Sequence, residues 1–238
     1  MSSCVFFMLL GKQKMKTKKY SCLKDKFPIG IHKIQHRPLK RIFDIVFSLF
    51  VLIFFFPVFL IIAFAIRFSS PGAIIYSHQR IGRGGKRFRC YKFRTMHVNA
   101  DKQLKKLFIE NPLLKKEWDR TQKLKNDPRI APIGVFLRKT SLDELPQFLN
   151  VLIGDLSVVG PRAMVVSEIN RFLGDKAKKI LSVRPGITGL WQTSGRSDTS
   201  YTQRIKLDET YINNYSLILD LRLIAKTIPT MLSSKGAY

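Results

Sequence analysis

Residues 45–66 read IVFSLFVLIFFFPVFLIIAFAI, and no other part of the sequence constrains the architecture as strongly. The run contains one hydroxyl side chain, Ser48, one proline, Pro57, and no charged residue. As a straight helix, its 22 residues would measure about 33 Å. The hydrocarbon core of a bilayer is about 30 Å thick, so length and composition predict a membrane-inserted helix.

Two features of this run predict a broken rather than a straight helix. Pro57 removes a backbone N–H from the middle of the run, which bends a helix. The flanks are equally basic, since residues 1–41 and 67–106 each carry eleven Lys and Arg against one acidic residue. Because basic flanks favour the cytoplasmic side, both ends are expected there. We therefore predict a re-entrant helix that dips into one leaflet, with the C-terminal amphipathic helices packed beneath it.

The charge balance of the 238-residue chain limits its partners. Lys and Arg number 42 against 16 Asp and Glu, which gives a formal net charge of +26. Such a balance predicts a polyanionic partner, which is nucleic acid, an anionic membrane surface or a phosphorylated substrate. The three cysteines, Cys4, Cys22 and Cys90, form neither a disulfide framework nor a metal-binding spacing, as expected in a reducing compartment.

Three regions are expected. Residues 1–36 are predicted to be a basic, poorly ordered arm, and its apolar patch is too short to span a membrane. Residues 37–68 contain the membrane-inserted helix, and residues 69–238 form a cytoplasmic domain.

The cytoplasmic domain is predicted to be α+β and mainly helical. Residues 73–77 and 88–95 have strand-like patterns on either side of a glycine-rich basic turn at 80–86, so one small β-hairpin is expected. The turn lacks the Gly-Lys-Ser/Thr ending of a P-loop. Turns at 157–162 and 184–189 each present an arginine. Helices are predicted at 98–125 with a break at Asn111-Pro112, and at 142–153, 167–181, 199–215 and 217–232. The last one has the wide apolar face of a buried or interfacial amphipathic helix.

The segment Thr140-Ser141-Leu142-Asp143-Glu144-Leu145-Pro146-Gln147 places two carboxylates side by side in a strongly cationic chain. One interpretation is a capping box, in which Ser141 accepts from the Glu144 N–H and the Glu144 side chain bonds the Ser141 N–H. The other is that the pair holds a divalent metal, or divides into a nucleophile and a helper. The two interpretations are compatible, because a helix start holds its first side chains firmly.

An ordered series of motifs resembles the bacterial sugar transferases, that is, the monotopic phosphoglycosyl transferases. The resemblance covers about residues 37–232. Each block alone is weak, but the series in this order is specific. The blocks are Lys40-Arg41-Ile42-Phe43-Asp44, Tyr91-Lys92-Phe93-Arg94-Thr95-Met96, Ser141-Leu142-Asp143-Glu144-Leu145-Pro146-Gln147, Gly154-Asp155-Leu156-Ser157, Val159-Gly160-Pro161-Arg162, Arg184-Pro185-Gly186-Ile187-Thr188-Gly189, and Leu207-Asp208 with Tyr211.

This resemblance implies a function. The family moves a hexose-1-phosphate from a nucleotide sugar to a polyprenyl phosphate, in the first step of lipid-linked glycan assembly. The expected substrates are thus a UDP-sugar and undecaprenyl phosphate, with UMP as product and downstream glycosyltransferases as expected partners in the pathway. The expected location is the cytoplasmic face of the bacterial inner membrane. Two anionic substrates also account for the basic balance without nucleic acid.

The resemblance also assigns residues. Asp143 corresponds to the nucleophile that forms a covalent phosphosugar intermediate, and Glu144 to the residue that assists it and holds Mg²⁺. Attack by a carboxylate on a phosphoryl group requires cations that neutralise the phosphates. The candidates in the shared motifs are Lys92, Arg138, Arg162 and Arg184, although each of them could also be an ordinary solvated surface charge.

The sequence departs from the family pattern at three places. Phe56 stands where a serine commonly precedes the membrane proline, Ala163 replaces a proline, and the N-terminal arm has no clear counterpart. No set of transmembrane helices precedes the apolar run, so a short-form member is expected. Two rival functions stay open: a membrane-associated nucleic-acid-binding or scaffold protein, in which Asp143-Glu144 is only a cap, and a hydrolase that uses the same site.

Overall fold

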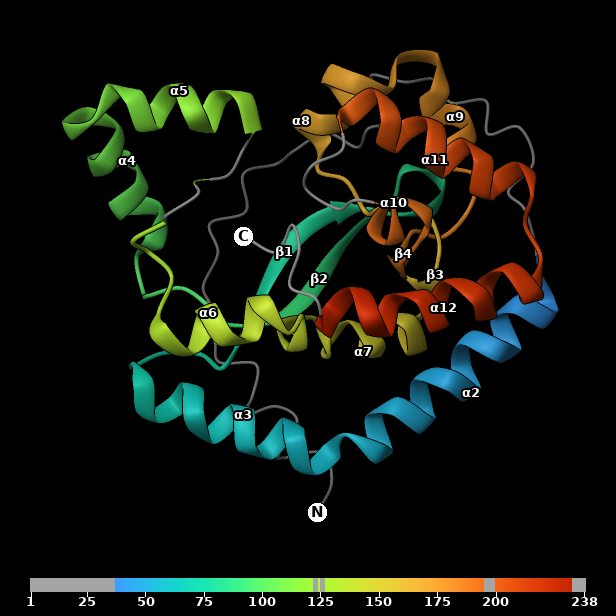
Figure 1. Cartoon of the computed structure of the whole chain (residues 1–238), viewed down its shortest axis with the longest axis horizontal. Coiled ribbons are helices and arrows are strands. Elements are labelled where there is room, and N and C mark those ends of the chain that lie inside the picture. The colour runs from blue at the N-terminus through green and yellow to red at the C-terminus, as the bar shows by residue number, and fades with distance from the viewer. Residues whose placement is uncertain (1–36, 122–123, 125–126, 195–199, 233–238) are drawn as a thin grey trace.

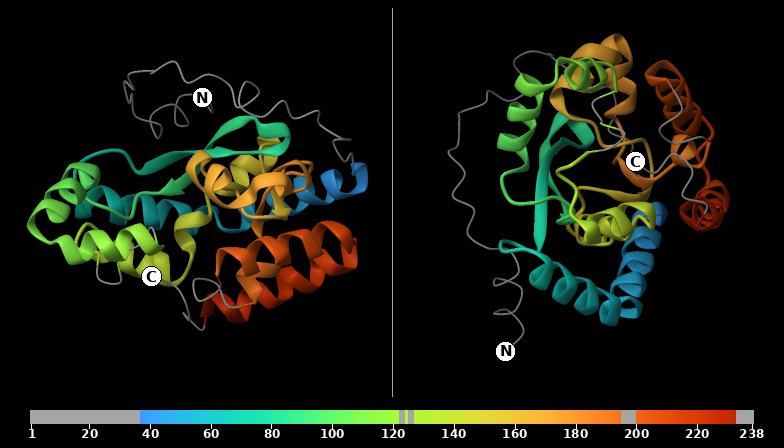
Figure 2. Two further views of the ribbon diagram at one scale, coloured as in Figure 1. Left: turned by 90° about the horizontal axis from the view of Figure 1, so that it is seen from above. Right: turned by 60° about the vertical axis from the view of Figure 1, so that its left-hand side comes forward.

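The computed structural model describes residues 37–121, 124, 127–194 and 200–232. The fold is α+β and mainly helical, as the sequence predicts. The predicted basic arm at residues 1–36 lies outside the described residues. Two long helices run along one edge of the molecule, and the remaining elements gather on their concave side (Figures 1 and 2).

The apolar run forms two helices rather than one. Helix α2, Pro38–Phe54, and helix α3, Phe56–Ser69, meet at Phe55 with a bend of 60°. Pro57 lies in the first turn of α3, where a missing N–H costs nothing and the fixed φ favours a new helix start. The predicted break near Pro57 is confirmed. Among the described residues, no single helix has the length and apolarity to cross a membrane, but the bent pair together does.

The predicted hairpin is present. Strand β1, Ile75–Ile81, pairs antiparallel with strand β2, Arg87–Phe93, so that Ile75 faces Phe93. A single 3₁₀ turn, Arg83–Gly85, connects them. Side chains alternate between the faces of β2. Phe88 and Cys90 enter one apolar core, Phe93 enters another, and Lys92 lies on the face of Phe88 and Cys90.

The segment after the hairpin is helical and broken where predicted. Helix α4, Ala100–Glu110, and helix α5, Pro112–Thr121, are separated at Asn111. They form an outlying arm at the upper left of Figure 1. Helix α6, Pro132–Lys139, is followed by the 3₁₀ turn η3, Leu142–Glu144, and by helix α7, Gln147–Ile153. The predicted helix at 142–153 therefore starts five residues late, because Pro146 and the tight turn before it interrupt the helical hydrogen bonds. Gly154, at a φ of 100°, ends it as expected.

A second sheet was not predicted. Strand β3, Ser157–Val159, pairs in parallel with strand β4, Gly186–Thr188, where the sequence analysis placed only turns. The backbones of the two segments lie close together, since a Cβ on Gly186 would lie 2.1 Å from the Gly160 backbone nitrogen. The expectation of one small hairpin as the only β-structure was wrong, because a three-residue strand leaves no readable alternation in the sequence.

The C-terminal half is helical with one correction. The single helix expected at 167–181 is divided at Gly174, whose φ is +47°. Its pieces are helix α8, Val166–Glu168, the π-helix η4, Ile169–Leu173, the 3₁₀ turn η5, Gly174–Lys176, and helix α9, Ala177–Ile180. Helix α10, Leu190–Thr193, helix α11, Tyr201–Asn213, and helix α12, Leu217–Leu232, follow. The last two agree with the prediction.

Two apolar cores position the site. The larger one joins β1, β2, β3 and the helices of the C-terminal half. The smaller one lies in the bend of α2 and α3, where Val51, Ile62 and Ile66 pack against Phe93, Leu137 and Leu145. Helices α6 and α7 therefore fill the bend. Of the C-terminal amphipathic helices, α12 contacts the N-terminal part of α2 through Lys40 and Asp220.

Candidate active site

The two adjacent carboxylates lie in the tight turn η3 between α6 and α7. Ser141, directly before the turn, has φ 56° and ψ 16°, and Asn99 is the only other described non-glycine residue with a positive φ. This left-handed conformation costs on the order of 1 kcal/mol for such a residue. The Ser141 side chain makes no capping hydrogen bond. The capping-box interpretation is therefore wrong, because a cap requires an extended residue at the start of a helix.

Lys92 joins the two carboxylates. Its Nζ lies 3.3 Å from Asp143 Oδ2 and 2.6 Å from Glu144 Oε1. The side chain of Asp143 is 9% exposed and that of Glu144 35% exposed. The pair thus consists of one sheltered carboxylate and one half-buried carboxylate, with a cation between them.

Burial and the Lys92 charge act on the two acids differently. Burial raises the pKa of Asp143 above its usual value, although Lys92 opposes this effect. Burial also acts to raise the pKa of Glu144, but the charge and hydrogen bond of Lys92 outweigh it and lower that pKa. Burial acts to lower the pKa of Lys92, but the charges of the two carboxylates outweigh it and raise that pKa. At neutral pH this cluster holds Glu144 as an anion beside a protonated Lys92.

Three of the four predicted cations surround this pair. Lys92 contacts it directly. Arg138, in the last turn of α6, donates from Nε to Thr95 Oγ1 at 3.0 Å and lowers the pKa of Asp143. Arg162 lowers the pKa of Glu144, and its guanidinium carbon lies 5.0 Å from the centre of the Trp191 ring.

Arg184 lies elsewhere. Its Nε donates to the Gly154 carbonyl at 2.8 Å, at the C-terminal end of α7. Helix α7 has seven residues and a length of about 10 Å, and the acidic pair precedes its other end. The charges around Arg184 are Arg83, Arg41 and Asp44. The structure therefore does not bring Arg184 to the carboxylates.

Further charged groups near the pair were not predicted from the sequence. Arg80 and Arg162 both lower the pKa of Glu144, and Arg80 forms an ion pair with Glu168 at 3.6 Å. The Tyr201 hydroxyl donates to Glu168 at 3.0 Å. Arg80 belongs to the basic turn, which is a signal in the sequence, whereas nothing in the sequence distinguishes Glu168 from a surface acid.

Asp208, in the Leu207-Asp208 block, is a buried acid near this group. Burial raises its pKa to about 7, although Arg162 and Arg204 act in the opposite direction. Neither of its carboxylate oxygens makes a hydrogen bond of good geometry. The sequence places Asp208 in a motif shared with the family, but its burial depends on tertiary packing.

The donor set of the acidic pair is compatible with Mg²⁺. Among the described residues, no group of three or more His, Cys, Asp or Glu could enclose a metal ion. Mg²⁺ in enzymes that act on phosphates is commonly held by one or two carboxylates together with substrate oxygens. Glu144, which is partly exposed beside Asp143, is suited to such a shared ion. The described residues do not form a metal site made only of protein ligands.

Comparisons with known proteins agree with this geometry. A family model described as bacterial sugar transferase matches residues 35–234. The chain belongs to the bacterial sugar transferase family. Both the resemblance and the expectation that the chain is a sugar-phosphate transferase are thus confirmed. The interpretation as a nucleic-acid-binding or scaffold protein gains no support.

Several relatives of this sugar transferase have descriptive names. The chain is 46% identical to the exopolysaccharide production protein ExoY of Sinorhizobium fredii over 84% of its own length and 88% of that protein. It is 47% identical to the undecaprenyl-phosphate galactose phosphotransferase of Salmonella typhimurium, over 88% of its length and 44% of that protein. The UDP-glucose:undecaprenyl-phosphate glucose-1-phosphate transferase of Escherichia coli is 39% identical over 85% of the chain and 42% of that protein.

Proposed function

We propose that this sugar transferase moves a hexose-1-phosphate from a UDP-sugar to undecaprenyl phosphate and releases UMP. The observation that supports this most is the sheltered Asp143 beside Glu144, joined by Lys92 and surrounded by Arg80, Arg138 and Arg162. The printed names of the relatives support the donor and acceptor classes. The product would begin assembly of an exopolysaccharide or a similar lipid-linked glycan, and later glycosyltransferases would extend it.

The reaction we propose has two steps. In the first, a carboxylate oxygen of Asp143 attacks the phosphorus next to the sugar, and the bond to the bridging diphosphate oxygen breaks. UMP leaves with that oxygen, and the phosphosugar is held as an acyl phosphate. In the second step, a phosphate oxygen of the lipid attacks the same phosphorus, which releases the Asp143 carboxylate. The site needs no general base, because both nucleophiles are anions.

The residues around Asp143 have defined parts in this proposal. Lys92 offsets the repulsion between the Asp143 carboxylate and the diphosphate, because its ammonium group is 3.3 Å from the nucleophile. Arg138 and Arg162 supply planar guanidinium groups that match phosphate oxygens. Glu144 would hold Mg²⁺ together with the substrate, and the ion would neutralise charge on the diphosphate. We assign Arg184 only a structural role, because it donates to the Gly154 carbonyl at the other end of α7.

The bent helix pair suits a lipid acceptor. Large apolar side chains are exposed along both helices, among them Val46, Phe50, Ile53, Ile61 and Phe64. Exposed apolar surface of this extent indicates a membrane or protein contact. We propose that α2 and α3 enter one leaflet of the inner membrane from the cytoplasmic side, with the catalytic domain at the surface.

Single-turnover chemistry tests the function. With labelled UDP-glucose or UDP-galactose and Mg²⁺ but no lipid, the enzyme should release about one equivalent of UMP and retain the labelled phosphosugar after acid quench. Asp143→Asn should lose both signals and reduce turnover by several powers of ten, because an amide is not a nucleophile. If UMP forms only when lipid is present, the two-step scheme is wrong. If the label goes to water and never to lipid, the protein is a hydrolase.

A further inference from the structure

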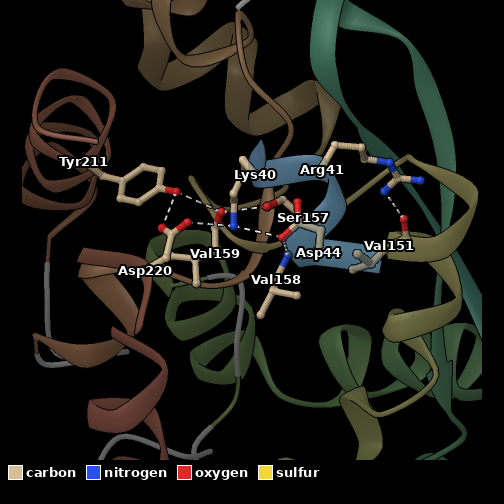
Figure 3. Close-up of polar contacts among 9 residues, drawn as sticks. All are labelled: Lys40, Arg41, Asp44, Val151, Ser157, Val158, Val159, Tyr211 and Asp220. Carbon is tan, nitrogen blue, oxygen red and sulfur yellow. Dashed lines mark hydrogen bonds and ion pairs between the residues drawn. The ribbon is translucent and has the colours of Figure 1, made fainter. Parts of the chain in front are cut away.

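The first turns of α2 contain charged side chains that are buried although they start a membrane-inserted helix. Lys40 is 6% exposed and Asp44 is 1% exposed, and Asp220 of α12 is fully buried beside them. Burial of charged groups is costly unless they are paired and hydrogen-bonded. Figure 3 shows the hydrogen bonds and ion pairs that these groups form.

The three charges form one network. Lys40 Nζ lies 2.9 Å from Asp44 Oδ1 and 2.9 Å from Asp220 Oδ2. Asp44 Oδ1 also accepts from the Val158 N–H of β3 at 3.1 Å. The Tyr211 hydroxyl of α11 lies 2.8 Å from Asp220 Oδ1 and 3.0 Å from the Val159 carbonyl. Hydrogen bonds and ion pairs thus join the N-terminal end of α2 to β3, α11 and α12.

Arg41 extends the contact to the helix that follows the catalytic pair. Its two terminal nitrogens donate to the carbonyls of Val151 and Leu152, at 2.5 and 2.9 Å, in the last turn of α7. A cation at the C-terminal end of a helix interacts favourably with its last carbonyls, and the Val151 carbonyl also accepts from the Gly154 N–H at 3.0 Å. The same helix presents Asn150, which accepts from the Tyr91 N–H and donates to the Arg89 carbonyl of β2.

These contacts place the catalytic pair at a fixed height relative to α2. Strand β2 contains Lys92, which pairs with both carboxylates. On the other side of the pair, Leu142 and Leu145 pack in the core that lies within the bend of α2 and α3. The pair is therefore connected to the membrane helices through rigid elements on both sides.

Stability alone does not explain the charges. A buried ion pair is often no more stable than apolar side chains of the same volume, whereas it can fix one geometry. We propose that Lys40, Arg41, Asp44 and Asp220 are positioning residues that set the height at which Asp143 meets the phosphate of the membrane-bound acceptor. This inference rests on the proposed function.

The proposal distinguishes the two steps of the reaction. The nucleotide sugar arrives from solution, so the first step is insensitive to the height of the site above the membrane. The phosphate of a polyprenyl lipid is confined to the membrane surface, so the second step depends on that height. A misplacement of about 1 Å in an active site can cost about 100-fold in rate.

The test uses the full-length enzyme reconstituted in lipid vesicles. Asp220→Asn keeps the shape of the side chain and the Lys40–Asp44 pair, whereas Lys40→Met combined with Asp44→Asn and Asp220→Asn removes all three charges. Lys176→Met is the matched control, since it breaks an exposed ion pair with Glu209 at 2.7 Å. Three rates are measured: UMP release without acceptor, transfer to undecaprenyl phosphate in vesicles, and transfer to farnesyl phosphate dispersed in detergent.

We expect UMP release to stay within about threefold of the wild-type rate and transfer in vesicles to fall by about 10- to 100-fold. Transfer to dispersed farnesyl phosphate should fall less than transfer in vesicles, and the control should change none of the rates. An equal loss in UMP release and in transfer, for Asp220→Asn as well as for the triple variant, would mean that the network only stabilises the fold. Unchanged transfer in vesicles would also overturn the proposal. If the proposed two-step function itself were wrong, the wild-type enzyme would show no UMP release without acceptor. That result differs from every outcome that contradicts the positioning role.

Discussion

At the scale of single residues, the position of one lysine decides the electrostatics of the site. Lys92 lies on the face of β2 that points toward η3, and its ammonium group contacts both carboxylates. Burial alone would raise the pKa of both acids. Lys92 counteracts that effect on Asp143 and outweighs it on Glu144, so it favours the anionic form of both carboxylates.

Replacing Lys92 by Met should therefore move the acid limb of activity to higher pH. Loss of a cation within contact distance raises a carboxylate pKa by about 1–3 units, so the nucleophile would be protonated over a wider range. The pH dependence of UMP release without acceptor measures this shift. Lys86→Met is the control, because Lys86 is an exposed lysine of the same hairpin. An acid limb that stays in place would mean that Lys92 does not face Asp143 during the reaction.

Asp208 should make the stability of the fold pH-dependent. Its pKa of about 7 in the folded protein lies above the usual 3.8 of an aspartate, so the folded state binds the proton more tightly than the unfolded state does. The stabilisation is complete below pH 3.8 and is lost as the pH rises toward 7. The pKa difference corresponds to about 4 kcal/mol at most.

Asp208→Asn removes this titration. Thermal melting at pH 5 and pH 8.5 should show that the variant gains stability relative to wild type at the higher pH, by on the order of 1 kcal/mol or more. Asp175→Asn serves as the control, because Asp175 is an exposed acid. The same difference in Tm at both pH values would contradict the assignment of Asp208 as a buried acid that titrates near pH 7.

At the scale of elements, a single proline determines the shape of the bent helix pair α2 and α3. Pro57 cannot donate to the Ile53 carbonyl, and the chain bends by 60° at this point. The bend creates the concave side that Leu137, Leu145 and Phe93 fill. The usual serine before the proline is replaced by Phe56, which is exposed here, so no neighbouring hydroxyl accompanies the break in this chain.

Pro57→Ala should straighten the helix, because it restores the missing hydrogen bond. Straightening would separate α3 from α6 and allow a fraction of molecules to span the membrane, so activity should fall by about tenfold or more although no catalytic group is touched. Transfer activity and protease protection of the N-terminal arm measure the two effects. Pro112→Ala, at the start of α5, is the control. Wild-type activity and topology in Pro57→Ala would show that the bend does not depend on the proline.

At the scale of the whole molecule, apolar surface and charge agree on one orientation. Exposed apolar side chains line α2 and α3, and others lie on α6 and α12, including Phe136, Leu221 and Ile228. The strongly basic chain favours contact with an anionic membrane surface. Both flanks of the bent pair are then expected on the cytoplasmic side.

Cysteine labelling tests this topology. In a variant without Cys4, Cys22 and Cys90, single cysteines are introduced by Tyr20→Cys or Lys102→Cys. A membrane-impermeant thiol reagent should label neither position in intact spheroplasts and both after lysis. Labelling of position 20 but not of position 102 in intact spheroplasts would show that the pair spans the membrane.

The sequence by itself determined the features that depend on local chemistry. The missing N–H of Pro57 predicts the break, the polar and apolar alternation predicts the hairpin, and Gly154 predicts the end of α7. The ordered motifs identify the family and single out Asp143 and Glu144. Each of these signals is contained in a few neighbouring residues.

Only the tertiary structure decided which distant residues meet. Lys92 reaches Asp143 across 51 positions, and Asp44 reaches the Val158 amide across 114. The wrong capping box at Ser141, the displaced Arg184, the parallel β3–β4 pair and the buried Lys40–Asp44–Asp220 network all depend on such contacts. A local pattern records the propensity of a segment, whereas the partner of a buried charge is fixed by the packing of elements that are far apart in the chain.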